Sequence, residues 1–297
     1  IGLELGSVWQ RLGANVTVIE YLDRILPGLD GEMAKQFQRL ITRQGVTVKL
    51  SSKVTSVKKS GKGASVEFEP VKGGMAETLK ADVVLVATGR APYTSGLGLE
   101  EAGVKTDRSY IVVDRYLQTS IPRIWACGDV HGGLQFTHVA AYEAVKLVRN
   151  MLFPGKSPIS YDDVPWALYT DPEVAHFGLT ETEAKVQHGD DVRTYAVEME
   201  DVDRAVVDRT TAGFVKFVCT RKGKILGAHI VAANASALIA EIVLARKKGM
   251  TIGGLATVVS PYPSLSDAIQ KAASLHYQQL SSSWVGAIGR RIAAWAQ

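Results

Sequence analysis

The spacing of apolar residues at the start of the chain alternates between a helical period and the period of two that is typical of strands. Residues 1–12 place apolar side chains at helical spacing, and the β-branched run over 15–19 predicts a short strand. Asp30 is a good N-cap for a second helix that runs to about Arg43. A helix, a strand and a helix in this order indicate an α/β domain with a parallel sheet.

From Val46 to Val86 the pattern becomes alternating, in the runs VTVKL, VTSVKK, ASVEFEP and ADVVLVA. Turn residues separate these runs at 60–63 and at 73–74. We therefore expect a strand parallel to the first, a small antiparallel excursion, and a buried return strand from Asp82 to Val86.

The middle of the chain is rich in loops over 91–123, and it then contains a second buried strand, 123–127, and a helix over 138–152. The best linker candidate is the Pro- and Gly-containing stretch 154–158. Beyond it the pattern predicts an α+β arrangement. Its expected elements are a strand at 166–170, a capping-box helix from 180, a hairpin of 214–219 and 225–231, helices over 236–249 and 264–280, and an amphipathic helix over 284–295.

The composition narrows the class of protein. With 297 residues, of which 46% are hydrophobic, the chain can fill two cores. The net charge of +4 comes without a basic run interleaved with aromatics, so we expect no nucleic-acid partner. No apolar run approaches the roughly 18 residues of a membrane span, and no secretory signal is visible, so no membrane role is expected. The widely spaced Cys127 and Cys219 indicate a reducing, cytoplasmic setting.

Two glycines near the first residue suggest nucleotide binding. Gly2 and Gly6, in IGLELG, open the first helix, whose free N–H groups and dipole would favour a pyrophosphate. Glu20 ends the following strand, where an acid binds the ribose 2′-hydroxyl and repels a 2′-phosphate. These residues match the back half of a dinucleotide-binding fingerprint and favour NAD(H) over NADP(H). A glycine that only lets the helix pack closely would leave the same partial pattern.

Two of the expected apolar strands each end in a motif that fits a ligand site. Gly89, in ATGR, follows the strand that ends at Val86, and Asp129, in ACGD, follows the strand over 123–127. Ligands bind at the carboxyl ends of strands in open α/β sheets, and a carboxylate there can accept bonds from a hydroxyl-rich ligand. A plain turn glycine and a helix-capping aspartate are the structural alternatives.

The stretches GLELGSVWQRLGANVTVIE, ATGRAPYTSGLGLE, RIWACGDV and DDVPWALYTDPEVAHFGLTE occur in this order. They resemble the flavoprotein disulfide reductases with two dinucleotide domains. Over 1–130 the chain is most similar to dihydrolipoamide dehydrogenases, and from about Val148 onward to mercuric-reductase-like enzymes. The resemblance covers essentially the whole chain and implies an α/β fold: a Rossmann-like NAD-binding domain over 1–91 without its first strand, the central part of an FAD-binding domain over 92–158, and an α+β dimerisation domain over 159–297.

The resemblance also implies roles for individual residues. Asp129 would bind the ribityl chain of FAD, and the C-terminal domain would form a homodimer in which each subunit completes the active site of the other. The residues that would run beneath the flavin are Gln135, Phe136, Thr137 and His138. The residues expected at the nicotinamide dinucleotide are Gly2, Glu20, Val54 and Gly89. Hydride would pass between NAD(H) and FAD, and electrons would continue to a disulfide or a metal ion.

The sequence departs from the family pattern in two places. By the resemblance, the N-terminal FAD domain and its redox-active cysteine pair have no counterpart within the 297 residues. Cys127 lies where a small core residue suffices, so we do not expect it to be a nucleophile. The motif His-Pro-Thr-x-x-Glu is replaced by YPSLSD, which puts Tyr262 and Asp267 at the places of the base and its acid. Tyrosine, with an ordinary pKa of about 10, is a poor base at neutral pH. We expect both residues on the substrate side; a residue packed beside prolines is the alternative for Tyr262.

These departures leave the substrate open between dihydrolipoamide, mercuric ion, a quinone and another disulfide. The chain ends without the cysteine pair that would hand mercury to such a site, and we expect no resident metal. A second hypothesis therefore stands beside the enzyme, in which the chain is a non-catalytic, dimerising fragment.

Overall fold

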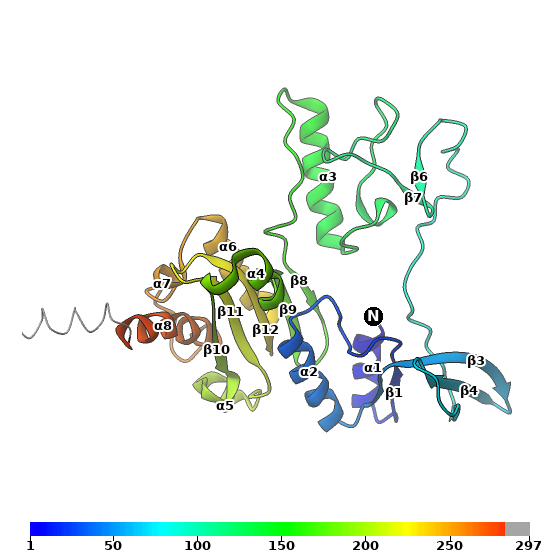
Figure 1. Cartoon of the computed structure of the whole chain (residues 1–297), viewed down its shortest axis with the longest axis horizontal. Helices are drawn as coiled ribbons and strands as arrows, with labels where there is room; N and C mark the ends of the chain where they lie inside the picture. The colour runs from blue at the N-terminus through cyan, green and yellow to red at the C-terminus, as the bar shows by residue number, and fades with distance from the viewer. Residues whose placement is uncertain (283–297) are drawn as a thin grey trace, which may run out of the picture. The chain divides into compact units, whose positions relative to one another are not determined.

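The computed structural model describes residues 1–282 (Figure 1). The chain forms two compact units. The first combines Ile1–Val86 with the chain from Pro165 onward, and the second is Ala87–Val164. The amphipathic helix expected over 284–295 lies outside the described residues.

The N-terminal part of the first unit has the expected order of helices and strands. Its elements are α1 (Gly2–Arg11), β1 (Thr17–Ile19), α2 (Gly31–Arg43) and β2 (Thr47–Lys49). β1 and β2 pair in parallel, with Val18 opposite Val48. The Asp30 carboxylate caps α2 by accepting hydrogen bonds from the N–H groups of Glu32 and Met33. The parallel pair and the N-cap of the second helix are thus confirmed.

A three-stranded antiparallel sheet follows and confirms the expected excursion. Its strands are β3 (Ser52–Ser60), β4 (Gly63–Pro70) and β5 (Glu77–Ala81). The return strand predicted from Asp82 to Val86 is wrong, because these residues form no strand and Val83 and Val86 are each 74% exposed. An apolar run becomes a strand only where a neighbour supplies the ladder hydrogen bonds. Among the described strands, β1 pairs with β2 alone, so the run finds no partner.

The centre of the first unit is a five-stranded antiparallel sheet. Its strands, in spatial order, are β10 (Val192–Glu198), β11 (Phe214–Thr220), β12 (Ile225–Ala232), β9 (Glu173–Gly178) and β8 (Trp166–Leu168). The β11–β12 hairpin and β8 confirm the predicted strands, whereas β9 and β10 have no counterpart among the predicted elements. Every residue of β11 and β12 is buried, because both faces of the sheet are covered.

Helices cover the two faces of this sheet (Figure 1). One face packs against α6 (Ala235–Lys247) and α8 (Asp267–Ser282), with α7 (Ile252–Leu255) beside α8. On the other face Phe37 of α2 packs with Phe214 and Val231, next to α4 (Glu181–His188). α4 begins with the predicted capping box of Thr180 and Glu183. The remaining short elements are α5 (Asp203–Asp208) and the 3-10 turns η2 (Gly189–Asp191) and η3 (Met199–Asp201).

The second unit is built around α3 (Thr137–Leu152), which confirms the helix predicted over 138–152. Its other regular elements are β6 (Thr106–Asp107), β7 (Tyr110–Ile111) and a 3-10 turn, η1 (Gly128–His131). The buried strand predicted over 123–127 is wrong, since this segment makes one isolated bridge, between Gln118 and Trp125. Ala126 packs into a small core with Ile111. Ile111 belongs to the two-stranded β6–β7 sheet, which the segment 123–127 does not join.

Candidate functional site

Glu20 lies directly after β1, and its backbone continues the parallel ladder. Its N–H donates to the Lys49 carbonyl at 2.8 Å, and its carbonyl accepts from the Ser52 N–H at 2.9 Å. Its carboxylate oxygen Oε1 accepts the Leu22 N–H at 2.9 Å. A partly exposed carboxylate that is fixed at a strand end has the placement needed to accept a hydrogen bond from a ribose hydroxyl.

The other residues expected at the dinucleotide lie on neighbouring elements of the first unit. Gly2 is the first residue of α1, and Val54, which is 42% exposed, lies in β3 beside a register irregularity of the β3–β4 pair. Gly6 is buried, and a Cβ there would meet the Val16 side chain at 3.4 Å. Close packing of α1 on β1 therefore accounts for Gly6 without a ligand.

In the second unit the structure brings the ATGR and CGD motifs together. The Arg90 guanidinium Nη1 lies 3.7 Å from Asp129 Oδ2, and the two side chains are 57% and 48% exposed. Gly89 has a φ of +123° with open space where a Cβ would stand. Gly128, with a φ of +76°, presses on α3 so closely that a Cβ would come within 3.1 Å of the Ala140 side chain. Asp129 is thus a half-exposed acceptor on a turn that has little room to move.

The four residues expected beneath a flavin form the entry to α3. Phe136 is the N-cap residue, in extended conformation, and Thr137 begins the helix. The rings of Phe136 and His138 lie 5.5 Å apart between centroids. Gln135 faces an open hollow of about 560 Å³. The other residues that line this hollow are Asp107, Tyr110, Ile111, Val112, Val113, His131, Gly132 and Gly133.

A buried carboxylate that sequence reasoning missed supports the Asp129 turn. Glu143 of α3 is 1% exposed and accepts the Gly128 N–H at 2.6 Å and the Tyr161 hydroxyl at 2.6 Å, with His131 Nε2 at 2.9 Å. Burial alone would raise the pKa of Glu143, but these hydrogen bonds hold the pKa below its usual range. The signal available in the sequence is a glutamate within the apolar helical run AAYEAVKLV.

Tyr262 and Asp267 lie close to the start of α8, as their spacing implies, but with different partners. The Tyr262 hydroxyl donates to Asp203 Oδ2 at 2.8 Å, whereas Asp267 Oδ2 pairs with Lys271 at 3.1 Å. Tyr262 is 75% exposed. The hydrogen bond to Asp203 and the negative charge of that carboxylate raise the pKa of Tyr262. A phenol in this state is a proton donor at neutral pH rather than a base.

The two cysteines are both free thiols. Burial, and then the nearby Glu143 carboxylate, raise the pKa of Cys127, and burial raises the pKa of Cys219. A protonated thiol is a weak nucleophile. The raised pKa fits the expectation that Cys127 is not a nucleophile, and Cys219 shares this property.

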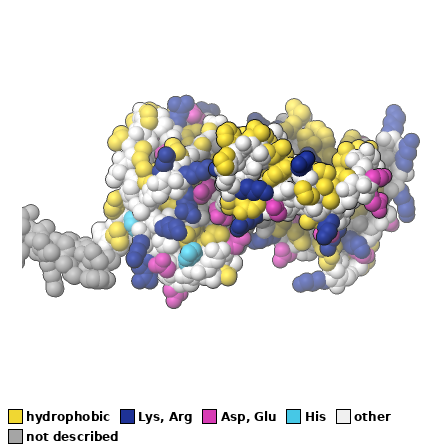
Figure 2. All heavy atoms as spheres, turned by 90° about the horizontal axis from the view of Figure 1, so that it is seen from above, with side chains coloured by type: hydrophobic (Ala, Val, Ile, Leu, Met, Phe, Trp, Pro, Cys, Tyr) yellow, Lys and Arg dark blue, Asp and Glu magenta, His cyan; other side chains and the backbone are white. Residues whose placement is uncertain are grey.

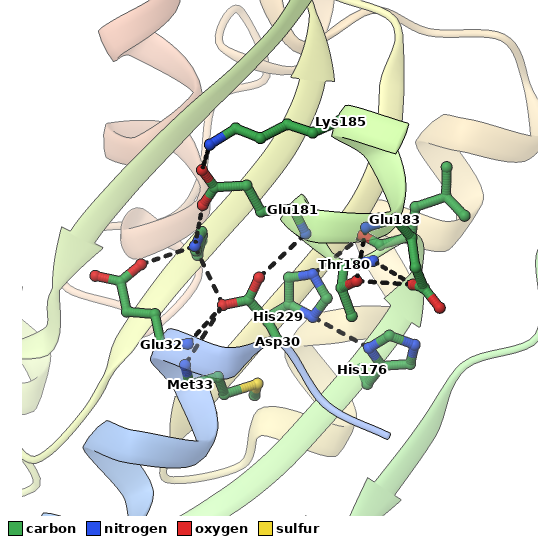
Figure 3. Close-up of polar contacts among 11 residues, drawn as sticks. Asp30, Glu32, Met33, His176, Thr180, Glu181, Glu183, Lys185 and His229 are labelled. Carbon is green, nitrogen blue, oxygen red and sulfur yellow. Dashed lines mark hydrogen bonds and ion pairs between the residues drawn. The ribbon is translucent and has the colours of Figure 1, made fainter. Parts of the chain in front are cut away.

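A second set of charged residues lies inside the first unit, and the sequence indicated only one of them, Asp30, as a helix cap (Figure 3). We call it the Lys216 cluster: the Lys216 ammonium, 2% exposed, contacts Asp30 Oδ1 at 3.2 Å, Glu32 Oε2 at 2.7 Å and Glu181 Oε2 at 2.8 Å. Asp30 Oδ2 also accepts the Glu181 N–H at 3.1 Å. The cluster therefore ties the N-termini of α2 and α4 to the middle of β11. The sequence signal for this cluster is the lysine within the apolar run FVKFVC.

Two buried histidines lie beside Lys216 on the neighbouring strands of the sheet. Lys216 stands opposite His229 in the β11–β12 register, and His229 stands opposite His176 in the β12–β9 register. The two Nδ1 atoms lie 3.1 Å apart, and His229 Nε2 lies 3.2 Å from the Leu179 carbonyl. Burial lowers the pKa of His176 to about 4 and that of His229 to about 3. Both rings are neutral at physiological pH.

The surface carries charges of both signs interspersed with apolar side chains on the face that Figure 2 shows. Within residues 1–282, no helix is both long and apolar enough to cross a membrane. In the same range, no three His, Cys, Asp or Glu side chains are grouped so that they could hold a metal ion.

Sequence comparisons identify relatives over most of the chain. Residues 1–144 match the profile described as pyridine nucleotide-disulphide oxidoreductase, and residues 164–273 match the dimerisation domain of the same family. Dihydrolipoyl dehydrogenase 3 of Pseudomonas putida is 42% identical over 92% of this chain and 58% of its own length. Dihydrolipoamide dehydrogenase of Chaetomium thermophilum is 40% identical over 94% of this chain and 56% of its own length. The chain thus spans a little over half the length of these relatives.

Solved structures give the same result. The HOCl-induced flavoprotein disulfide reductase RclA from Escherichia coli superposes with a TM-score of 0.82 and 29% identity, over 91% of this chain and 61% of that one. LpdA from Mycobacterium tuberculosis gives a TM-score of 0.83 and 32% identity, over 92% and 59%. Proteins of this family are redox enzymes that use FAD and NAD(H). The two matched domains, in their order along the chain, show that it belongs to the pyridine nucleotide-disulphide oxidoreductases.

Proposed function

We propose that this chain forms the NAD(H)-binding part, a portion of the FAD site and the dimerisation domain of an FAD-dependent, NAD(H)-linked oxidoreductase. The chemistry supplied at such a site is hydride transfer between nicotinamide and flavin, followed by reduction of a disulfide or a metal ion. One observation carries the proposal: Asp129 stands half-exposed on a turn whose backbone is fixed by a buried carboxylate.

The residues around Asp129 fit a flavin with its polyol chain. A ribityl chain offers hydroxyl donors, and the Asp129 carboxylate can accept from them because its contact to Arg90 is long, at 3.7 Å. Gly132 and Gly133 both have positive φ and face the open hollow beside Gln135. A Cβ at Gly132 would meet the Tyr110 ring at 3.4 Å, so glycine lets the backbone pack closely on that ring at the edge of the hollow.

At the dinucleotide site the proposed role of Glu20 is to accept the ribose 2′-hydroxyl and to reject a 2′-phosphate. We predict that Glu20→Ala weakens NADH binding about tenfold and leaves NADPH binding nearly unchanged, since it removes one charge-assisted hydrogen bond. Glu77→Ala is the matched control, because Glu77 is an exposed glutamate of the same unit that pairs with Lys49. Equal losses for NADH and NADPH in E20A, measured by fluorescence titration, would argue against this role.

On the substrate side we propose that Tyr262, whose single hydroxyl proton is donated to Asp203, presents the lone pair of its oxygen to the substrate, and that Asp267 adds negative charge nearby. This arrangement favours a mercuric-reductase-like or other reductase activity over the dihydrolipoamide reaction, whose motif requires a base at this place. It is also consistent with a metal ion or a disulfide as the final acceptor. A copper(II) complex is described for the Escherichia coli reductase, which is 28% identical to this chain.

We further propose that the domain over 159–297 forms a homodimer, that nucleic acid and membranes are not partners, and that the protein works in the cytoplasm. The match to the family's dimerisation domain supports the first point. The free thiols of Cys127 and Cys219 support a reducing compartment.

The direct test is to incubate the purified chain with FAD, remove the excess, and record the flavin absorbance band before and after NADH. Retention of flavin and bleaching of the band by NADH are the expected results. A colourless protein that sediments as a dimer would contradict the enzyme proposal for this chain and would favour the alternative, a non-catalytic dimerising fragment.

A further inference from the structure

Glu143 is a charged side chain that is buried in the second unit. Both of its carboxylate oxygens are used: Oε2 accepts the Gly128 N–H and lies against His131 Nε2, and Oε1 accepts the Tyr161 hydroxyl. At 1% exposure the group is almost completely buried. A buried carboxylate is tolerated only when such donors replace its hydration.

The geometry joins this carboxylate to the Asp129 turn through one short bond. The Gly128 N–H lies 2.6 Å from Oε2, and Asp129 is the next residue. Gly128 has a φ of +76°, a conformation that the sequence alone does not enforce, because glycine occupies many others. Glu143 thus selects one conformation of the turn, and the Ala140 side chain closes off the space on the same side.

His131 and Tyr161 fix the carboxylate in turn. His131 ends the same 3-10 turn and is 9% exposed, so the first and last residues of η1 converge on a single oxygen of Glu143. Tyr161 reaches the other oxygen from the segment after α3, at 2.6 Å. Burial and the contact with Glu143 both raise the pKa of Tyr161, so its hydroxyl remains a donor.

We propose that Glu143 is a positioning residue for the hydroxyl-rich ligand of Asp129: it holds the Gly128–Asp129 turn in the one conformation that presents the Asp129 carboxylate to a flavin polyol. The inference rests on the proposed role of Asp129 in FAD binding. It assigns the control of flavin affinity to the buried Glu143 and its two partners, His131 and Tyr161, without contact to the flavin.

The test combines a spectroscopic signature with a double-mutant cycle on the whole 297-residue chain. In flavin-free protein, Glu143→Gln is expected to shift the Gly128 amide proton resonance strongly upfield, because a short bond to a charged acceptor is lost. With FAD, E143Q and Asp129→Asn are each expected to weaken binding about tenfold. Because both act on the same contact, the double variant should bind no more than about tenfold more weakly than wild type.

Asn150→Ala is the matched control. Asn150 is a 5% exposed polar residue of the same helix that bonds the backbone of Ser157 at 2.8 Å, so its loss should leave the Gly128 resonance in place. Additive losses in the double variant, or an unmoved Gly128 resonance in E143Q, would overturn the inference while the proposed function stands. Failure of the wild-type chain to bind FAD would instead overturn the proposed function.

Discussion

Replacing Lys216 by methionine should strongly destabilise the first unit. The change preserves most of the side-chain volume but removes the charge that three carboxylates share. The loss in free energy of unfolding depends on how far each carboxylate is exposed to water. Glu32 is 56% exposed and Glu181 27%, so water can solvate both, whereas Asp30 is only 3% exposed. One buried carboxylate would therefore lose its counter-ion.

Removing one partner of a buried ion pair costs about 3–5 kcal/mol. We expect the lower end, about 3 kcal/mol, because Asp30 keeps the N–H groups of Glu32, Met33 and Glu181 as donors. For a unit of this size that loss lowers the midpoint of thermal unfolding by roughly 6–12 °C. The free energy of unfolding, obtained from urea titration and calorimetry, is the quantity to compare between variants.

Two further variants separate charge from packing. Lys185 also pairs with Glu181, at 2.5 Å, but is 59% exposed, so Lys185→Met should cost less than about 0.5 kcal/mol. Asparagine caps a helix as well as aspartate does, so the double change Lys216→Met with Asp30→Asn should recover part of the loss. Two results would refute the reasoning: a loss of stability in K216M as small as that in K185M, or a double variant that is less stable than K216M.

The remaining predictions concern pH and backbone conformation. The pKa values of His176 and His229 lie below the ordinary 6.5, so the unfolded chain binds more protons than the folded one. Their contribution to stability is full above about pH 7.5 and should fall by about 2 kcal/mol for each ring by pH 5, about 4 kcal/mol together. Urea titrations at several pH values would show this slope, and His176→Gln should reduce it by about half, whereas His188→Gln, on the exposed side of α4, should leave it unchanged. Gly213→Ala should cost about 4 kcal/mol or prevent folding, because φ is +117° and a Cβ would lie 1.9 Å from the Val231 carbonyl oxygen. Gly73→Ala, with φ of +84° but open space, should cost only about 1 kcal/mol; equal unfolding midpoints for these two variants would contradict the clash.

Elements with strong local signals were predictable from the sequence. The capping box at Thr180 and the N-cap at Asp30 begin helices where expected, because a cap is satisfied within its own turn. The predicted strands at 82–86 and 123–127 failed, because an apolar run specifies burial but not the partner strand that must supply its hydrogen bonds.

The residues of the candidate site show the same difference between local and long-range features. Glu20 and Asp129 could be named because their motifs are local, at the end of a strand and in a Gly-Asp turn. The Arg90–Asp129 contact and the role of Glu143 depend on segments that meet only in the fold. In the sequence, Lys216 and Glu143 are each a charged residue inside an apolar run. This pattern indicates that the charge has a buried partner, but it does not identify the partner.

The placement of α2 on the central sheet has a consequence for the order in which the protein can mature. Asp30 and Lys216 are 186 residues apart in sequence, with the whole second unit between them. At about 5–20 residues per second, a ribosome needs on the order of ten to forty seconds to cover that distance. During this interval the apolar face of α2, with Met33, Phe37 and Ile41, has been made but its covering strands have not. We therefore expect chaperones to bind the exposed apolar face of α2 in the nascent chain until β11 and β12 emerge.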